Sequence, residues 1–186
     1  ALDELINLDQ FIDAWAMEVM IGHWDSYTGN ANNFYFYRDE EDDRYQFIPW
    51  GIDAILMGDE PFGEGLPVSI VGNTSLPATL ANIPETRERF HDAQDLLLEQ
   101  VWDEEVLESR LDDAIALTED AAWPNDDDEG WYSYALRLTR RFIWNRRDHI
   151  EEERAEEEPE IDADLDESPC LVSAGTVSLD FETTWG

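Results

Sequence analysis

The chain has 186 residues, of which 42% are hydrophobic and 12% aromatic, so a packed domain with an appendage is expected and global disorder is not. Its 46 acidic and 11 basic residues give a net charge of -35, which argues against nucleic acid as a partner. The sequence contains no apolar run near the roughly 20 residues of a membrane span, and the single Cys170 excludes an internal disulfide. Two explanations of the charge stay open: a solvating surface for salty or extracellular surroundings, or an acidic face for cationic partners.

The first predicted element is a helix over residues 8–22. Apolar residues recur there at the i, i+3, i+4 spacing of one helical face, namely Leu8, Phe11, Ile12, Trp15 and Val19. Asn7 is the expected N-cap, and Gly22 is expected to end the helix. The chain then enters a polar loop over residues 23–33.

Two short runs rich in aromatic residues follow this loop. FYFYR (34–38) and YQFIPW (45–50) are typical of strands, and the acidic turn between them predicts an antiparallel hairpin. Residues 54–80 are rich in Gly and Pro, so a long irregular segment is expected there.

The pattern downstream of residue 83 is helical. Pro84 is expected at the first position of one helix, Asp103 is expected to cap the next, and a last helix is predicted over about 130–153 after a loop at 124–130. The predicted fold class is therefore α+β and mainly α-helical, with a β-hairpin after the polar loop and a helical bundle downstream. An acidic linker (154–169) and the start of a truncated β-like segment (170–186) are expected after the first domain (1–153).

The polar loop contains a pattern found in phosphoryl-transfer enzymes. His23 and Asp25 are followed by Asn30 in an H-x-D-x4-N spacing, in which a kinase uses the Asp toward the acceptor hydroxyl and the Asn as a metal ligand. A second acid, Asp53, follows the second strand. The order of helix, loop, hairpin and acid is that of a kinase C-terminal lobe. The alternative is a turn built by local hydrogen bonds of Asn, Asp and Ser.

The same stretch resembles a known family. NNFYFYRD followed by FIPWGID is similar to the CotH kinase family, the spore coat protein H-like atypical kinases, and the downstream ETRERFHDAQDLLLEQ and FIWNRRDHI also resemble it. The resemblance covers about residues 5–153. It implies a kinase-like domain of which this chain holds the C-terminal part, with the N-terminal lobe absent.

The resemblance also implies roles for individual residues. Asp25 would be the catalytic aspartate, which orients or deprotonates the acceptor hydroxyl. Either Asn30 or Asn33 would bind the metal, and Asp53 would bind Mg2+ that bridges the phosphates of ATP. Mn2+ is the alternative cation. The implied substrate is Ser or Thr of secreted or surface proteins, which places the protein outside the cell or on its surface, joined to further domains.

Two departures from the family pattern affect the expected activity. Gly51 stands in P-W-G-I-D where the family has the first acid of its P-W-D-x-D segment, and the chain contains no Lys for the phosphates. The fragment alone is therefore expected to bind ATP poorly. The alternative function is a catalytically degenerate binding or adhesion module of a larger extracellular protein.

Other candidate residues have simpler interpretations. His23 is expected to be a helix-end or packing residue, and Trp24 and Trp50 are expected in the core rather than as stacking platforms. The acidic runs 126–128 and 162–166 lack a complete Ca2+ loop pattern and are interpreted as solvated segments. The arginines of the last helix are expected to pair with neighbouring acidic helices.

Overall fold

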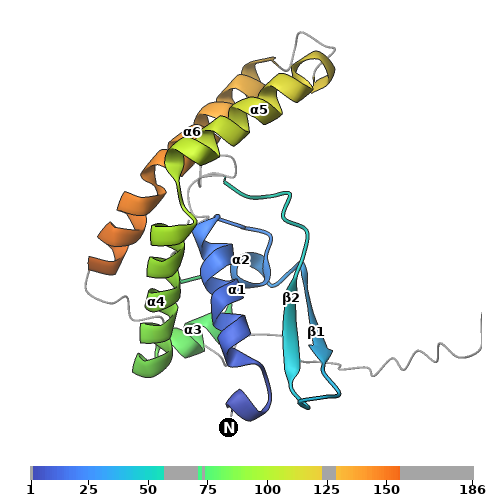
Figure 1. Ribbon diagram of the computed structural model, residues 1–186, viewed down its shortest axis with the longest axis vertical. Helices are drawn as coiled ribbons and strands as arrows, with labels where there is room; N and C mark the ends of the chain where they lie inside the picture. Colours follow the sequence, from blue (N-terminus) through green and yellow to red (C-terminus); the bar gives the residue numbers. More distant parts are fainter. Residues whose placement is uncertain (1, 57–70, 73, 123–128, 156–186) are drawn as a thin grey trace, which may run out of the picture.

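The computed structural model describes residues 2–56, 71–72, 74–122 and 129–155 (Figure 1). The fold is α+β and mainly helical, as predicted. Its elements, in chain order, are the 3-10 helix η1 (Leu2–Glu4), α1 (Leu8–Met20), α2 (Tyr27–Asn30), β1 (Phe34–Arg38), β2 (Tyr45–Pro49), α3 (Ser75–Ala81), α4 (Pro84–Gln100), α5 (Glu104–Ala122) and α6 (Glu129–Ala155). Helices α5 and α6 run side by side and extend beyond the body formed by α1, α4 and the hairpin (Figure 1).

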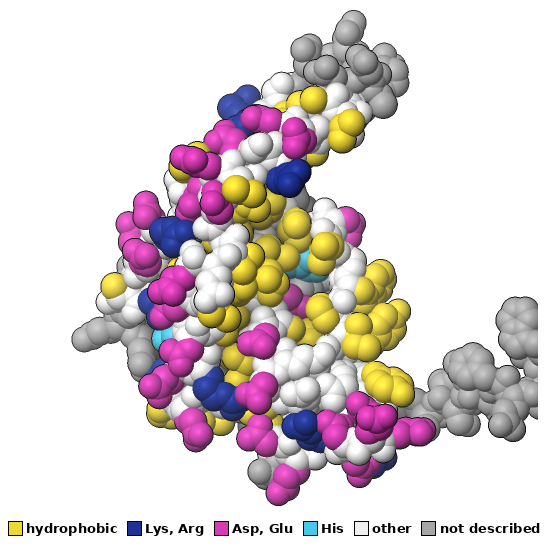
Figure 2. Space-filling model, in the orientation of Figure 1, with side chains coloured by type: hydrophobic (Ala, Val, Ile, Leu, Met, Phe, Trp, Pro, Cys, Tyr) yellow, Lys and Arg dark blue, Asp and Glu magenta, His cyan; other side chains and the backbone are white. Residues whose placement is uncertain are grey.

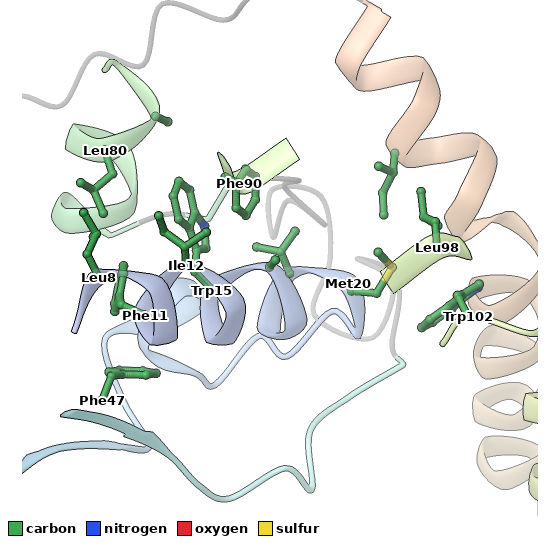
Figure 3. Packing of buried hydrophobic residues seen from close by; sticks show 14 of the residues in the cluster. Leu8, Phe11, Ile12, Trp15, Met20, Phe47, Leu80, Phe90, Leu98 and Trp102 are labelled. Atoms are coloured by element: carbon green, nitrogen blue, oxygen red, sulfur yellow. The ribbon is translucent and has the colours of Figure 1, made fainter. Parts of the chain in front are cut away.

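Helix α1 lies at the centre of the core. Its N-cap is Asn7 as predicted, with the side chain accepting the N–H of Gln10. Phe11 and Trp15 are both 0% exposed on its buried face. Trp15 stacks on Phe90 of α4 at a centroid distance of 3.8 Å, while Phe11 meets Phe47 of β2 edge-on at 5.3 Å (Figure 3). Helix α1 is therefore held between α4 and the hairpin.

The predicted hairpin is present, with Phe34 opposite Pro49 and Arg38 opposite Tyr45. The outer edge of β2 is covered, because the N–H of Asn7 donates to the Tyr45 carbonyl at 2.9 Å and the Tyr45 N–H donates to Leu5 at 2.8 Å. The sheet has two strands, and within the described residues the backbone of β1 pairs with β2 alone. The outer edge of β1 therefore has no backbone partner in the part of the chain that the structure describes.

The outer face of the hairpin carries exposed aromatic side chains. Tyr35 is 59% exposed and Trp50 is 49% exposed, and their rings are nearly parallel with centroids 6.0 Å apart. The prediction that Trp50 belongs to the core was wrong, because strand alternation directs it to the face opposite Phe47. Figure 2 shows hydrophobic side chains gathered on the hairpin side and acidic ones spread over much of the remaining visible surface.

Part of the segment expected to be irregular is helical. Helix α3 forms over Ser75–Ala81 and buries Leu80. Pro77 lies in its first turn, where a backbone N–H is not needed for a helical hydrogen bond. The stretch 57–70 of the same expected segment lies outside the described residues.

The helices downstream follow the prediction closely. Pro84 occupies the first turn of α4, and the Asp103 side chain caps α5 by accepting the N–H of Val106 at 2.9 Å. Helix α6 begins at Glu129 and ends at Ala155. None of the described helices is long and apolar enough to cross a membrane. The expected linker and β-like segment after residue 155 lie outside the described part of the chain.

The expected pairing with an acidic helix is confirmed for two arginines of α6, Arg140 and Arg147, whereas the buried Arg146 donates to backbone carbonyls of α1. Arg140 donates to Glu108 at 2.5 Å and to Asp112 at 2.5 Å, and Arg147 donates to Glu104 at 3.0 Å. These bonds join α6 to α5 along the extended pair. They are partly exposed to solvent, so each contributes modestly to stability.

Candidate active site

The polar loop begins where α1 ends. Gly22 has a left-handed φ of 60°, which a residue with a side chain rarely adopts, and its N–H donates to the Val19 carbonyl at 3.0 Å. The N–H of His23 then donates to the Glu18 carbonyl at 2.9 Å. These bonds close the helix and fix the direction in which the chain reaches Asp25.

Helix α2 folds the loop back toward Asp25. Ser26 caps this helix, because its Oγ accepts the N–H of Gly29 at 3.1 Å. The Ser26 carbonyl accepts two further N–H groups, from Asn30 at 2.9 Å and from Asn32 at 3.1 Å. The result is a compact turn whose amide side chains lie beside Asp25.

Three amide side chains converge on the Asp25 carboxylate. Asn30 and Asn32 each donate through Nδ2 to Oδ1, at 3.0 Å and 3.1 Å. Asn33 donates through Nδ2 to Oδ2 at 2.9 Å and also to the Asp25 backbone carbonyl at 2.9 Å. Both carboxylate oxygens thus have amide donors, and no described residue donates a hydrogen bond to the amide oxygens of the three Asn residues.

These donors control the charge of Asp25. Hydrogen bonds from Asn30, then Asn32 and Asn33, lower the pKa of the Asp25 carboxyl below its ordinary value, because they stabilise the charged form. Asp25 is therefore ionised at neutral pH. An ionised carboxylate held at fixed orientation can accept a hydrogen bond from a substrate hydroxyl and neutralise a cation.

Replacement of Asn33 by alanine is expected to raise the pKa of Asp25 toward its ordinary value, since one donor to the charged form is lost. Because the folded-state pKa is lowered, these bonds stabilise the fold above the unfolded-state pKa of about 3.9, and that stability is lost as the pH falls through the folded-state value. The variant should lose less stability in this acidic window than the natural chain.

A carboxyl-detected NMR titration of Asp25 measures the change in pKa, and urea unfolding at several pH values measures the change in stability. Asn145→Ala, an exposed substitution on α6, is the matched control and should leave both unchanged. An unaltered Asp25 pKa in the Asn33 variant would contradict the role given to that amide.

The segment after β2 lies directly against this cluster. The N–H of Trp50 donates to the Asn33 carbonyl at 3.1 Å, and His23 donates through Nε2 to the Gly51 carbonyl at 2.9 Å. Gly51 has a φ of 70°, and a Cβ placed on it would lie 3.0 Å from the Asn33 side-chain carbon. Position 51, where the family pattern has an acid, thus adjoins the amide that holds Asp25.

Asp53 lies in an exposed turn beyond Gly51. Its Cα lies within about 7.6 Å of the Gly51 Cα, because two residues separate them at most by twice 3.8 Å. The chain then returns to α1, where the N–H of Leu56 donates to the Ile21 carbonyl at 2.8 Å. No hydrogen bond or ion pair joins Asp53 to another described residue. The structure therefore brings Asp25, Asn30 and Asn33 together, while Asp53 follows Gly51 by two residues and makes no hydrogen bond to them.

The side-chain oxygens near Asp25 are suited to bind a hard divalent cation. Carboxylate and amide oxygens are the ligand types that Mg2+ accepts, and Mg2+ in nucleotide sites needs one or two carboxylates with water and phosphate oxygens. Asn33 is well placed among them, because its Nδ2 donates to Asp25 and its Oδ1 accepts no hydrogen bond from a described residue. Within the described residues, however, no three His, Cys, Asp or Glu side chains form a group able to hold a metal.

Two site residues were missed or underestimated from the sequence. Asn32 donates to Asp25 as Asn30 does, and the only signal for it was its place in the Asn-rich run. His23 is 4% exposed, as expected of a packing residue, and it also joins the loop to the Gly51 carbonyl.

A family model described as CotH kinase protein matches residues 1–161. The chain belongs to the CotH kinase family. The CotH match includes the whole polar loop of residues 23–33 (the Asp25 loop), the hairpin and every described helix, so the resemblance seen in the sequence is confirmed. Membership in the CotH family makes the chain kinase-like. A kinase-like family implies ATP, a divalent metal and a protein substrate as ligands. No curated protein matches the chain.

Proposed function

We propose that this chain carries the catalytic segment of an atypical protein kinase that uses ATP and Mg2+ or Mn2+. The γ-phosphate would pass to Ser or Thr hydroxyls of secreted or surface proteins. The observation that supports this proposal most is the convergence of three amide donors on Asp25, beside the segment that holds Gly51 and Asp53. These donors hold the ionised carboxylate in a fixed orientation, as the positioning of a substrate hydroxyl requires.

In this proposal Asp25 acts on the acceptor hydroxyl. Its carboxylate accepts the hydroxyl hydrogen bond and takes the proton as the acceptor oxygen bonds to the γ-phosphorus, while the bond to the β-phosphate oxygen breaks and ADP leaves. The hydrogen bonds that lower the pKa of Asp25 also hold its carboxylate in place, so that it can orient the hydroxyl as well as accept its proton. The side-chain oxygens of Asn33, with Asn30 as the alternative, and of Asp53 would hold the cation, which neutralises phosphate charge when bound.

A phosphotransfer assay on the full natural polypeptide tests the proposal. With labelled ATP and Mg2+ or Mn2+, Asp25→Asn is expected to lower kcat by at least about 100-fold, the contribution of a positioned proton acceptor. Asp113→Asn, an exposed change on α5, is the control and should retain the rate. The proposal fails if the natural protein shows neither transfer nor a nucleotide-dependent thermal shift, or if Asp25→Asn keeps the natural rate.

A second candidate function is that of a catalytically degenerate binding module in a larger extracellular protein. Gly51 favours it, because the position next to Asn33 supplies no carboxylate to a cation. The exposed Tyr35 and Trp50 rings offer such a module a contact surface. The two candidates differ in whether the natural chain binds a divalent cation at this place.

Gly51→Asp separates the two candidates. Asp tolerates the left-handed φ at this position better than most residues, although its Cβ must displace the Asn33 side chain by a few tenths of an ångström. If the natural site lacks a metal ligand because residue 51 is Gly, Gly51→Asp should show a Mn2+-dependent rise in Tm that the natural protein lacks. Gly51→Ala is the control, because it adds the backbone strain, about 1 kcal/mol, without a carboxylate. A Mn2+-dependent rise in Tm of the same size in the natural protein and in both variants would contradict the degenerate module.

A further inference from the structure

A buried carboxyl lies under the Asp25 loop and has no role in the chemistry described above. Glu18 is on α1, one turn after Trp15, and is 5% exposed. Burial raises the pKa of its carboxyl, and the Thr28 N–H that it binds partly opposes the rise. A carboxyl in a core costs free energy that a leucine of similar volume avoids. Its place on the buried face of α1 therefore needs a reason other than packing.

The contact of Glu18 supplies that reason. Its Oε2 accepts the N–H of Thr28 at 3.1 Å, in the first turn of α2. Ser26 satisfies the N–H of Gly29 in the same turn. The two acceptors together cap a helix of four residues, which is too short to be stable by its own hydrogen bonds.

Helix α2 connects this cap to Asp25. The helix begins at the groups that Glu18 and Ser26 bind, and it ends at Asn30, whose amide donates to Asp25. The carbonyl of Thr28 is packed against Gly72, so α2 has little room to shift on that side. Because α2 is only four residues long, a movement of its first turn also moves its last residue, Asn30. The Asn30 amide is the donor that most lowers the pKa of Asp25.

We propose that Glu18 is a positioning residue, which holds α2 through the Thr28 N–H and so sets the geometry of the Asn30–Asp25 hydrogen bond. Any effect of Glu18 on catalysis rests on the proposed kinase function. Its effect on the geometry of Asp25 is independent of that function. A measurement on Asp25 itself therefore separates a failure of this inference from a failure of the proposed activity.

The experiment compares Glu18→Leu with Glu18→Gln in the full chain. Leucine fills the volume but cannot accept the Thr28 N–H, while glutamine keeps an acceptor oxygen and loses the charge. Glu18→Leu is expected to raise the Asp25 pKa by on the order of one unit, measured by carboxyl NMR, and to shift the Asn30 side-chain amide resonances. Glu18→Gln should leave both near their natural values.

Gln94→Leu is the matched control, because Gln94 is 0% exposed on α4 and this substitution also removes a buried polar group. It should lower the stability without changing the Asp25 pKa. If Glu18→Leu does not fold, Glu18→Asp, which shortens the side chain and withdraws the carboxylate from Thr28, replaces it with the same expected change. The inference is overturned if a folded variant that loses the Thr28 contact keeps the natural Asp25 pKa and Asn30 resonances. With an active kinase, kcat should fall in Glu18→Leu and be retained in Glu18→Gln.

Discussion

Replacement of Gly29 by alanine is expected to destabilise the fold by about 2–3 kcal/mol and to separate the Asn30 amide from Asp25. A Cβ on Gly29 would lie 2.3 Å from the Trp24 carbonyl oxygen and 2.9 Å from the His23 carbonyl oxygen. These are backbone atoms that cannot rotate away as a side chain can, so α2 must move as a whole. Urea unfolding measures the loss of stability, and NMR titration of Asp25 measures the loss of its donor.

A glycine-to-alanine substitution in α6 should have the opposite effect on stability. Gly130 is on α6, and a Cβ there would meet no atom within 4 Å. Gly130→Ala is therefore expected to stabilise the fold by up to about 1 kcal/mol, because alanine favours a helix more than glycine does. If Gly29→Ala were as stable as the natural chain, with an unchanged Asp25 pKa, the close packing of α2 on residues 23–24 would be contradicted.

Arg146→Met is expected to destabilise the fold by about 2–4 kcal/mol. Arg146 is 1% exposed, and its guanidinium donates to the carbonyls of Val19 at 2.5 Å and Met20 at 3.2 Å. Burial lowers the pKa of Arg146 to about 10, yet the group stays charged at neutral pH. Methionine fills much of the volume but removes the donor to the Met20 carbonyl, and a buried carbonyl without a donor costs about 1–3 kcal/mol. The Val19 carbonyl loses one of its two donors and keeps the N–H of Gly22.

Because α1 ends at Met20, the same change should also loosen the start of the Asp25 loop. Thermal unfolding and amide exchange at Gly22 and His23 measure the two effects. Arg110→Met is the control: the Arg110 side chain is 79% exposed, and its removal should change stability by less than about 0.5 kcal/mol. A comparable effect in both variants would show that Arg146 contributes no more than a surface charge.

The regular elements could be predicted because their patterns are strong. Helix α1 has a full apolar face, and the two aromatic runs allow only a hairpin around their acidic turn. Helix α3 was missed because it is short, contains Pro77 and follows a Gly-rich stretch, so its formation depends on tertiary packing of residues such as Leu80. The exposure of Trp50 was missed because composition favours a buried tryptophan, while strand alternation places it outside.

The site could be predicted in part. The H-x-D-x4-N spacing and the family resemblance indicated Asp25, Asn30 and Asn33, which the structure does bring together. Whether these residues act as assigned stays a prediction, as does the role of Asp53. Glu18 was not considered, although its position three residues after Trp15 puts a carboxyl on the apolar face of α1. A charged residue on such a face is a signal that sequence reasoning can use.

The outer edge of β1, which no described residue covers by backbone pairing, also bears on how the protein behaves at high concentration. An edge strand with exposed aromatic side chains and without Lys, Pro or a bulge is a template on which another chain can pair. Two copies that approach each other both carry a charge of -35, so they repel at neutral pH and low salt. Colloidal stability of this chain therefore depends on its carboxylates, and acid or concentrated salt removes the barrier to edge pairing.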